Sequence, residues 1–110
     1  MRTLSAFLIV GLATACAAAG QAQGKKTYDK LCASCHGAEG RGNAEKAALL
    51  KIEPRLLDLS RPEAANLPRD SLRKILLEGK GKMPAYRKKL KANEVDPVLD
   101  FAISLARGKG

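Results

Sequence analysis

The sequence predicts an all-α domain, and three observations support this prediction. Apolar residues recur at helical spacing in residues 24–31, 69–78 and 97–105, whereas no stretch alternates between polar and apolar residues as a half-buried strand would. Glycine and proline separate these stretches, as expected for loops between short helices. Beyond the apolar run at the N-terminus, the 110-residue chain has three aromatic residues and no tryptophan. A domain of this size needs a staple, a metal or a cofactor to complete its core.

The N-terminal half of the domain is predicted to contain two short helices. The first covers residues 24–31, which have no internal helix breaker. Residues 37–43 are rich in glycine and polar side chains and are predicted to form a loop. The second helix covers residues 44–52 and ends before Pro54, because proline disfavours helical backbone in the residue before it. Residues 55–60 are predicted to be irregular. Three leucines of that segment are expected to face the core: Leu56, Leu57 and Leu59.

The C-terminal half is predicted to contain two further helices joined by a loop. Residues 69–78 form the first, and Gly79 is a favourable stop after it. A loop over residues 79–84 follows. The last helix is predicted to begin with Asp96 as its N-cap and Pro97 as its first residue, which is a favoured pairing. The core faces of the two helices are expected to carry Leu72, Ile75, Leu76, Val98, Phe101 and Leu105.

Residues 1–22 have the layout of a secretory signal peptide. A basic start precedes an apolar run over residues 4–12, and small residues follow it. The apolar run is shorter than the stretch of about 20 residues that a transmembrane helix needs. Cleavage is predicted near Ala19 or Ala22, with Ala22 preferred because small residues stand at the required positions. The sequence therefore predicts an exported protein whose mature domain covers residues 23–110.

Cys16 leaves two alternatives open for the N-terminus. The residues before Cys16 distantly resemble a bacterial lipobox, which would make Cys16 the lipidated N-terminus of a protein anchored on the periplasmic side of a membrane. The match is poor, because Ala13 stands where such motifs usually carry leucine. Otherwise Cys16 is a small apolar residue that is discarded with the signal peptide. For the leader as a whole, the alternative to a cleaved signal peptide is a retained membrane anchor.

Residues 32–36 read Cys-Ala-Ser-Cys-His, a C-x-x-C-H motif. Two thiols three positions apart lie on one face of a helical turn, and the next residue projects beside them. Cys32 and Cys35 can form thioether bonds to the vinyl groups of a haem, and His36 can then place its imidazole beneath the iron; this spacing is typical of c-type haem attachment. A tetrahedral zinc site lacks a fourth ligand, because the mature domain has no other cysteine or histidine. A thiol oxidoreductase would need strands that the pattern does not predict.

The chain resembles the class I monohaem c-type cytochromes that bacteria export, and the resemblance covers essentially all of the mature sequence. The resemblance rests on the C-x-x-C-H motif, on Gly24 and Tyr28 in the first helix, on Phe101 in the last, and on a segment over residues 79–86. It implies a small fold of three to five short helices wrapped around one covalently attached haem c. It also implies that the first and last helices cross where Gly24 allows Tyr28 and Phe101 to approach.

Within this resemblance, His36 and Met83 are the expected axial ligands of the iron. Met83 is the only methionine besides Met1, and Pro84 restricts its loop. The alternative for Met83 is a methionine that fills a gap in the core. The resemblance also places the carbonyl of Pro54 as the acceptor for the second ring N–H of His36, which would fix the imidazole. A His/Met pair raises the reduction potential and closes both axial positions.

The chain is basic, with a formal net charge of +9. Six cations fall close to Met83 in sequence: Lys80, Lys82, Arg87, Lys88, Lys89 and Lys91. A positive patch of this kind steers acidic redox partners, an electron donor and an acceptor, with a salt-dependent rate. A merely solvated charged face is the alternative. Nucleic-acid binding is less well supported, because the basic segment lacks stacking aromatics and the protein is predicted to be exported.

The predicted function is electron transfer rather than catalysis. One haem c would carry one electron between exported redox partners in the periplasm, with the protein a monomer or a subunit of a complex. The alternative is a cytochrome subunit of a larger periplasmic dehydrogenase or oxidase complex. Contact with a membrane is expected only if Cys16 is lipidated.

Overall fold

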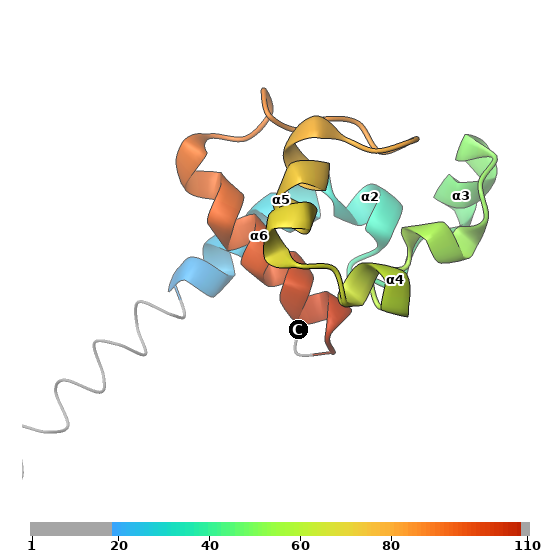
Figure 1. The fold of residues 1–110 in the computed structure, drawn as a ribbon, viewed down its shortest axis with the longest axis horizontal. Helices are drawn as coiled ribbons and strands as arrows, with labels where there is room; N and C mark the ends of the chain where they lie inside the picture. The colour runs from blue at the N-terminus through green and yellow to red at the C-terminus, as the bar shows by residue number, and fades with distance from the viewer. Residues whose placement is uncertain (1–18, 109–110) are drawn as a thin grey trace, which may run out of the picture.

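The computed structural model describes residues 19–108, and the all-α prediction is confirmed for this part of the chain (Figure 1). The described elements are a helix over residues 19–31, α2 (Ala33–His36), α3 (Ala44–Leu50), the 3₁₀ helix η1 (Pro54–Leu57), α4 (Pro62–Ala65), α5 (Arg69–Glu78) and α6 (Ala92–Ala106). No strand occurs in residues 19–108; the one β-type pairing is an isolated bridge between Lys80 and Met83. Most of the predicted leader, including Cys16, lies outside the described residues.

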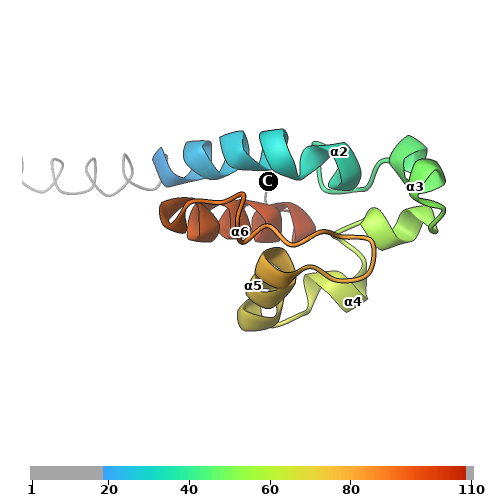
Figure 2. The ribbon, with the colours of Figure 1, turned by 90° about the horizontal axis from the view of Figure 1, so that it is seen from above.

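The N-terminal helix (residues 19–31) crosses α6 and packs against it, as the two views together show (Figure 1 and Figure 2). Gly24 faces the backbone of Pro97 so closely that a Cβ atom at Gly24 would lie 2.2 Å from the Pro97 oxygen. Beside this contact, the rings of Tyr28 and Phe101 are tilted by 57° with centroids 5.3 Å apart. This tilted geometry is favourable for aromatic pairs. The expected contact of Gly24, Tyr28 and Phe101 is therefore confirmed.

The predicted start of the last helix is wrong. α6 begins at Ala92, and Pro97 lies inside it rather than at its first position. The side chain of Glu94 accepts a hydrogen bond from the Lys91 N–H at 2.8 Å, which satisfies a free donor at the helix start. Pro97 lacks the N–H that would bond to the Asn93 carbonyl, at a cost to the helix. Burial of three apolar side chains around it offsets this cost: Val95, Val98 and Leu99.

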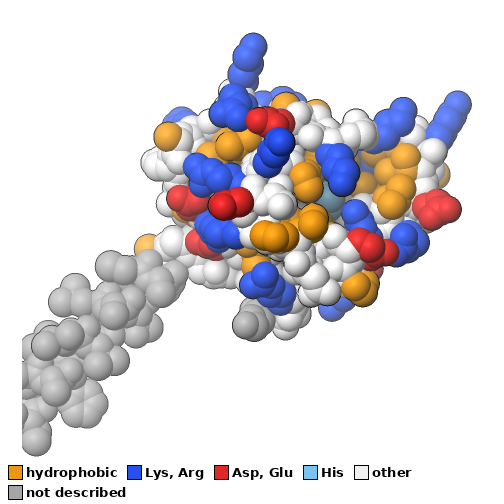
Figure 3. All heavy atoms as spheres, viewed as in Figure 1, with side chains coloured by type: hydrophobic (Ala, Val, Ile, Leu, Met, Phe, Trp, Pro, Cys, Tyr) orange, Lys and Arg blue, Asp and Glu red, His pale blue; other side chains and the backbone are white. Residues whose placement is uncertain are grey.

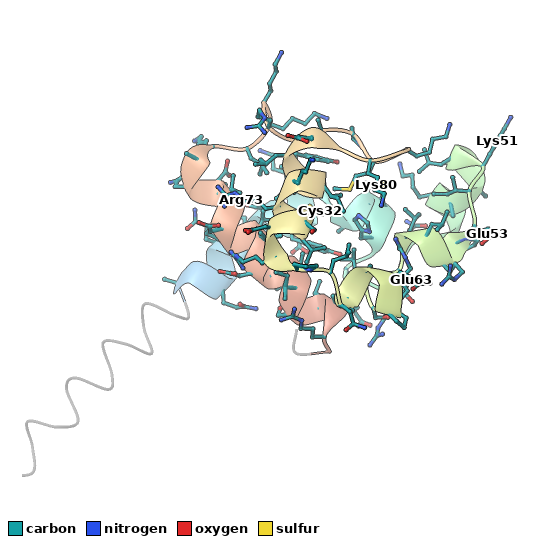
Figure 4. All side chains as sticks on the ribbon, in the orientation of Figure 1. Cys32, Lys51, Glu53, Glu63, Arg73 and Lys80 are labelled. Atoms are coloured by element: carbon teal, nitrogen blue, oxygen red, sulfur yellow. The ribbon has the colours of Figure 1, made fainter. Side chains whose placement is uncertain are left out.

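α5 has the predicted bounds and packs across α6. Leu76 is buried, with Leu72 and Ile75 half-buried on the same face. Asp96, which the sequence suggested as a helix cap, instead pairs with Arg69 at 3.2 Å and with Arg73 at 2.8 Å. Figure 4 shows Arg73 projecting from α5 towards α6. These ion pairs are exposed and contribute little to the stability of the fold.

The segment between α3 and α5 differs in detail from the prediction. α3 ends at Leu50, because Lys51 adopts a left-handed conformation with φ 59° and caps the helix. The short helix α4 was not predicted. Leu57 is buried and Leu59 half-buried as expected, but the prediction for Leu56 is wrong, since it is 43% exposed. In the 3₁₀ helix η1, consecutive residues point about 120° apart, so Leu56 and Leu57 cannot face the same side.

Within residues 19–108, none of the helices combines the length and apolar character needed to cross a membrane.

Candidate functional site: a haem attachment turn

The C-x-x-C-H motif occupies the junction of the N-terminal helix and α2. The Cys32 N–H donates to the Tyr28 carbonyl at 2.8 Å, and the Cys32 carbonyl then accepts from Cys35 at 3.2 Å and from His36 at 3.0 Å. The Tyr28 hydroxyl donates to the Gly37 carbonyl at 2.6 Å, which fastens the far end of the motif to the helix before it. The motif is thus held as one rigid turn that presents two thiols and an imidazole.

Both thiols of the motif are free and half-buried. Burial, together with the neighbouring Cys35, raises the pKa of the Cys32 thiol to about 11. The haem-free chain therefore keeps Cys32 as a neutral thiol rather than a thiolate. Among residues 19–108, no three His, Cys, Asp or Glu side chains converge as a metal-binding group.

His36 is fixed by a hydrogen bond from the opposite segment. Its Nδ1 lies 2.9 Å from the Leu57 carbonyl oxygen. A carbonyl only accepts, so Nδ1 carries the proton and Nε2 keeps its lone pair for a metal. Burial lowers the pKa of His36; the bond to Leu57 opposes this shift, and the charge of Arg61 adds to it. The imidazole is therefore neutral and oriented, as an axial ligand must be.

The expected role of Pro54 in this contact is wrong. The acceptor is the carbonyl of Leu57, three residues later. Pro54 is exposed and begins the helix η1, so its carbonyl lies at the wrong end of the segment. Leu57 ends η1, where a carbonyl has no partner within the helix and can accept from a side chain.

Met83 lies in a tight loop whose backbone is held by hydrogen bonds. Lys80 and Met83 exchange two backbone hydrogen bonds, each 3.0 Å long. Gly79 adopts φ 79°, and a Cβ atom there would lie 2.7 Å from the Met83 oxygen, so this loop requires glycine. The loop is further tied down where the Tyr86 N–H donates to the Leu76 carbonyl at 3.0 Å. Met83 is half-buried against the core.

These groups fit a haem. The donor set comprises two thiols at the attachment spacing, an imidazole with a free nitrogen, and a thioether in a rigid loop. Half-buried apolar side chains from separate segments border the core: Cys32, Leu59, Leu72, Leu77, Met83 and Tyr86. In the space-filling view the histidine side chain is visible between apolar side chains (Figure 3). A flat apolar group such as a haem would cover these side chains and remove their apolar surface from water.

Three participants in the site were not identified from the sequence. The Leu57 carbonyl is a backbone atom and has no side-chain signal. The hydroxyl of Tyr86 donates to the Leu31 carbonyl at 3.1 Å, and so joins the Met83 loop to the residue before Cys32. Arg61 contacts the segment that holds Leu57. Only Tyr86 had a sequence signal, because it belongs to the segment that resembles the ligand loop.

The basic surface includes residues that were not part of the predicted patch. A cleft of about 580 Å³ lies between the N-terminal helix and the segment before α6. Five lysines line it: Lys26, Lys30, Lys88, Lys89 and Lys91. Lys26 and Lys30 are far in sequence from Met83 and were not included in the predicted patch. The helix crossing brings the two groups together.

Fold, attachment turn and ligand-type residues together define a monohaem c-type cytochrome. The family described as cytochrome c oxidase, cbb3-type, subunit III matches residues 19–101, and the chain belongs to this family. A search of curated proteins finds no relative that matches the chain. Members of the family carry covalently bound haem c, which agrees with the spacing of Cys32 and Cys35, and they serve as electron carriers.

Proposed function

We propose that this protein carries one electron at a time on a single haem c, with His36 and Met83 as the axial ligands, between exported redox proteins. A bound haem supplies the iron that changes oxidation state. The observation that carries the proposal is the orientation of His36: its Nδ1 is bonded to the Leu57 carbonyl, directly after two free cysteines, so Nε2 is available to the iron.

The two proposed ligands differ in what they contribute. The neutral imidazole of His36 is a strong ligand, and its hydrogen bond raises its basicity. The Met83 thioether favours the ferrous state and so raises the reduction potential. With both axial positions closed, dioxygen and peroxide would find no open site. This arrangement supports electron transfer over catalysis.

The basic surface supports acidic redox partners. The six cations predicted near Met83 are all exposed. Lys26 and Lys30 extend this basic surface, because they line the cleft together with Leu31, the residue before the attachment turn. Five lysines and one carboxylate, Glu94, line the cleft, so its local charge is strongly positive. Such a field raises the rate of encounter with negatively charged proteins and weakens as salt rises.

A second candidate function is a subunit of a larger periplasmic complex, which the family's description as an oxidase subunit favours. Two large apolar side chains on the α3–η1 segment also support it, since Leu49 is 77% exposed and Leu56 is 43% exposed. A partner subunit could cover them. Purification at low salt in mild detergent distinguishes the candidates: a subunit stays with its partner, and a free carrier elutes alone.

The predicted cleavage site is compatible with where burial begins. Of residues 19–23, none is buried, and Gly24 is the first buried residue of the N-terminal helix. Cleavage after Ala22 would therefore cost the described structure no core residue. The mass of the mature protein tests this proposal and also tests the alternative of lipidation at Cys16.

The function is tested by reduced and oxidised spectra of the purified protein and its Met83→Ala variant. The parent protein should show c-type bands and the sulfur–iron band at the red end of the ferric spectrum. Met83→Ala should lose that red band, bind carbon monoxide in the ferrous state and have a lower potential. A matched control, Leu72→Ala, shortens another half-buried apolar side chain and should keep the band. Retention of the band in Met83→Ala would exclude Met83 as the ligand.

A further inference from the structure

The segment that carries the acceptor for His36 is contacted by an arginine to which neither the sequence nor the family comparison assigns a role. Arg61 is half-buried at the start of α4, after the segment that carries Leu57. Its Nη1 donates to the Leu56 carbonyl and reaches the Asp58 carbonyl at 3.2 Å. Leu56 and Asp58 are the two neighbours of Leu57. The guanidinium therefore grips the backbone on both sides of the carbonyl that accepts from His36.

The backbone of Arg61 is itself well anchored. Its carbonyl accepts from Ala64 and from Ala65, each at 2.9 Å, because Arg61 is the N-cap of α4. The same Nη1 also lies 3.4 Å from the Arg55 carbonyl, so the side chain spans the whole C-terminal end of η1. A cation at that end is well placed, because the carbonyls of a helix end are partly negative and unpaired.

Further contacts keep the gripped segment rigid. The Asp58 carboxylate accepts from the Ser60 N–H at 2.8 Å and from the Ser60 hydroxyl at 2.6 Å. The Leu59 N–H donates to the Gly40 carbonyl at 2.8 Å, which joins the segment to the loop after the attachment motif. With these bonds in place, the direction of the Leu57 carbonyl depends on the contacts of its neighbours, and Arg61 makes two of them.

We propose that Arg61 is a positioning residue for His36: it fixes the Leu57 carbonyl that orients the imidazole, and it places a positive charge beside that hydrogen bond. This inference rests on the proposed role of His36 as the haem ligand. When the ring nitrogen that does not bind the metal donates a hydrogen bond, the imidazole becomes a more basic ligand. The length and direction of this hydrogen bond depend on how firmly the acceptor carbonyl is held. The positive charge of Arg61 acts on His36 and so would also act on an iron that His36 binds. Reduction removes one positive charge from the iron, so a nearby cation favours the reduced state.

The two effects of Arg61 can be separated by two substitutions. Arg61→Gln removes the charge and the Nη1 group that contacts the carbonyls. Arg61→Lys keeps the charge, but its ammonium sits on a flexible stem and does not hold the carbonyls with the fixed geometry of a planar guanidinium. Arg107→Gln is the control, because Arg107 is exposed beyond the C-terminal end of α6, and its loss changes net charge by the same amount.

Potentials and the His36 ring proton are measured on the haem-loaded proteins. In Arg61→Gln, loss of the charge favours the oxidised state, and weaker donation by His36 opposes this effect but is smaller in size. The equilibrium constant for reduction against a reference couple should therefore fall about tenfold, which is about 59 mV for one electron. The control should change it less than threefold. Arg61→Lys should have a reduction potential close to that of the parent protein. Exchange of the His36 Nδ1 proton with solvent, followed by NMR, should be at least tenfold faster in Arg61→Lys than in the parent.

The outcomes that overturn the inference are equally definite. A potential for Arg61→Gln equal to that of the control refutes the charge effect, and an unchanged rate of exchange in Arg61→Lys refutes the positioning effect. If Arg61→Gln fails to fold, the exchange rate in Arg61→Lys decides. The parent spectrum separates this inference from the proposed function: a parent without c-type bands overturns the function, whereas normal bands with no effect of Arg61 overturn the inference alone.

Discussion

Replacement of Gly24 by alanine addresses the contact on which the helix crossing depends. The added Cβ would lie 2.2 Å from the Pro97 oxygen, 2.8 Å from the Pro97 carbonyl carbon and 3.1 Å from the Phe101 Cβ. The first two atoms belong to backbone, so no change of rotamer can move them away. A carbon–oxygen contact needs about 3.3 Å, and the two helices would have to separate by about 1 Å.

The cost follows from what that separation disturbs. Insertion of a methyl group into a well-packed site costs about 1–3 kcal/mol, and a rigid backbone neighbour places this case at the upper end. Separation also loosens the ring pair of Tyr28 and Phe101, which contributes roughly 0.5–1.5 kcal/mol beyond burial. Alanine returns about 1 kcal/mol, because it forms helix better than glycine. The expected net loss of stability is therefore about 3 kcal/mol.

Denaturant unfolding and thermal unfolding of the haem-loaded protein, followed by circular dichroism and by the haem absorbance, measure this loss. For a domain of this size, about 3 kcal/mol corresponds to a fall in Tm of at least roughly 12 °C. Lys26→Ala is the matched control on the same helix, because Lys26 is exposed; its effect should stay within about 0.5 kcal/mol. If Gly24→Ala were as stable as Lys26→Ala, the close approach of the helices could not be essential to the fold.

Three further predictions concern the loop, the last helix and the basic surface. Tyr86→Phe removes the hydroxyl bond to Leu31 and should lower stability by about 1 kcal/mol in denaturant unfolding, with the red band retained; unchanged stability would show that the bond contributes nothing. Pro97→Ala should raise stability by about 1 kcal/mol by restoring a hydrogen bond inside α6, and a fall instead would mean that the ring packs productively. Lys88→Glu should slow oxidation by anionic hexacyanoferrate several-fold at low salt and accelerate oxidation by a cationic complex, as measured by stopped flow. Equal effects on both reagents would argue against electrostatic steering.

The attachment chemistry was predictable because it is local. Cys32, Cys35 and His36 lie within one helical turn, and short-range backbone geometry alone brings their side chains together. α5 was predictable for a related reason: its apolar period and its glycine stop are both properties of the local sequence. The crossing at Gly24 was accessible only through the family resemblance, since the backbone that approaches Gly24 belongs to a residue far along the chain.

The start of α6 shows how a local rule can fail. Asp96 and Pro97 form a favoured helix start, but a capping side chain at Glu94 and buried residues on both sides of Pro97 favour an earlier one. Burial outweighs the single hydrogen bond that proline removes. Asp96 is then free to pair with Arg69 and Arg73 on α5.

The sequence by itself determined the class of protein: the attachment motif, the helical periods and the loop of Met83 all depend on neighbours within a few residues. Only the tertiary structure decided which backbone carbonyl accepts from His36, which arginine bonds to the carbonyls of the two neighbouring residues, and which lysines share a cleft. The physical reason is that these contacts join segments far apart in the chain. A carbonyl oxygen is the same in every residue, so its role follows from the path of the backbone and not from the side chain that it carries.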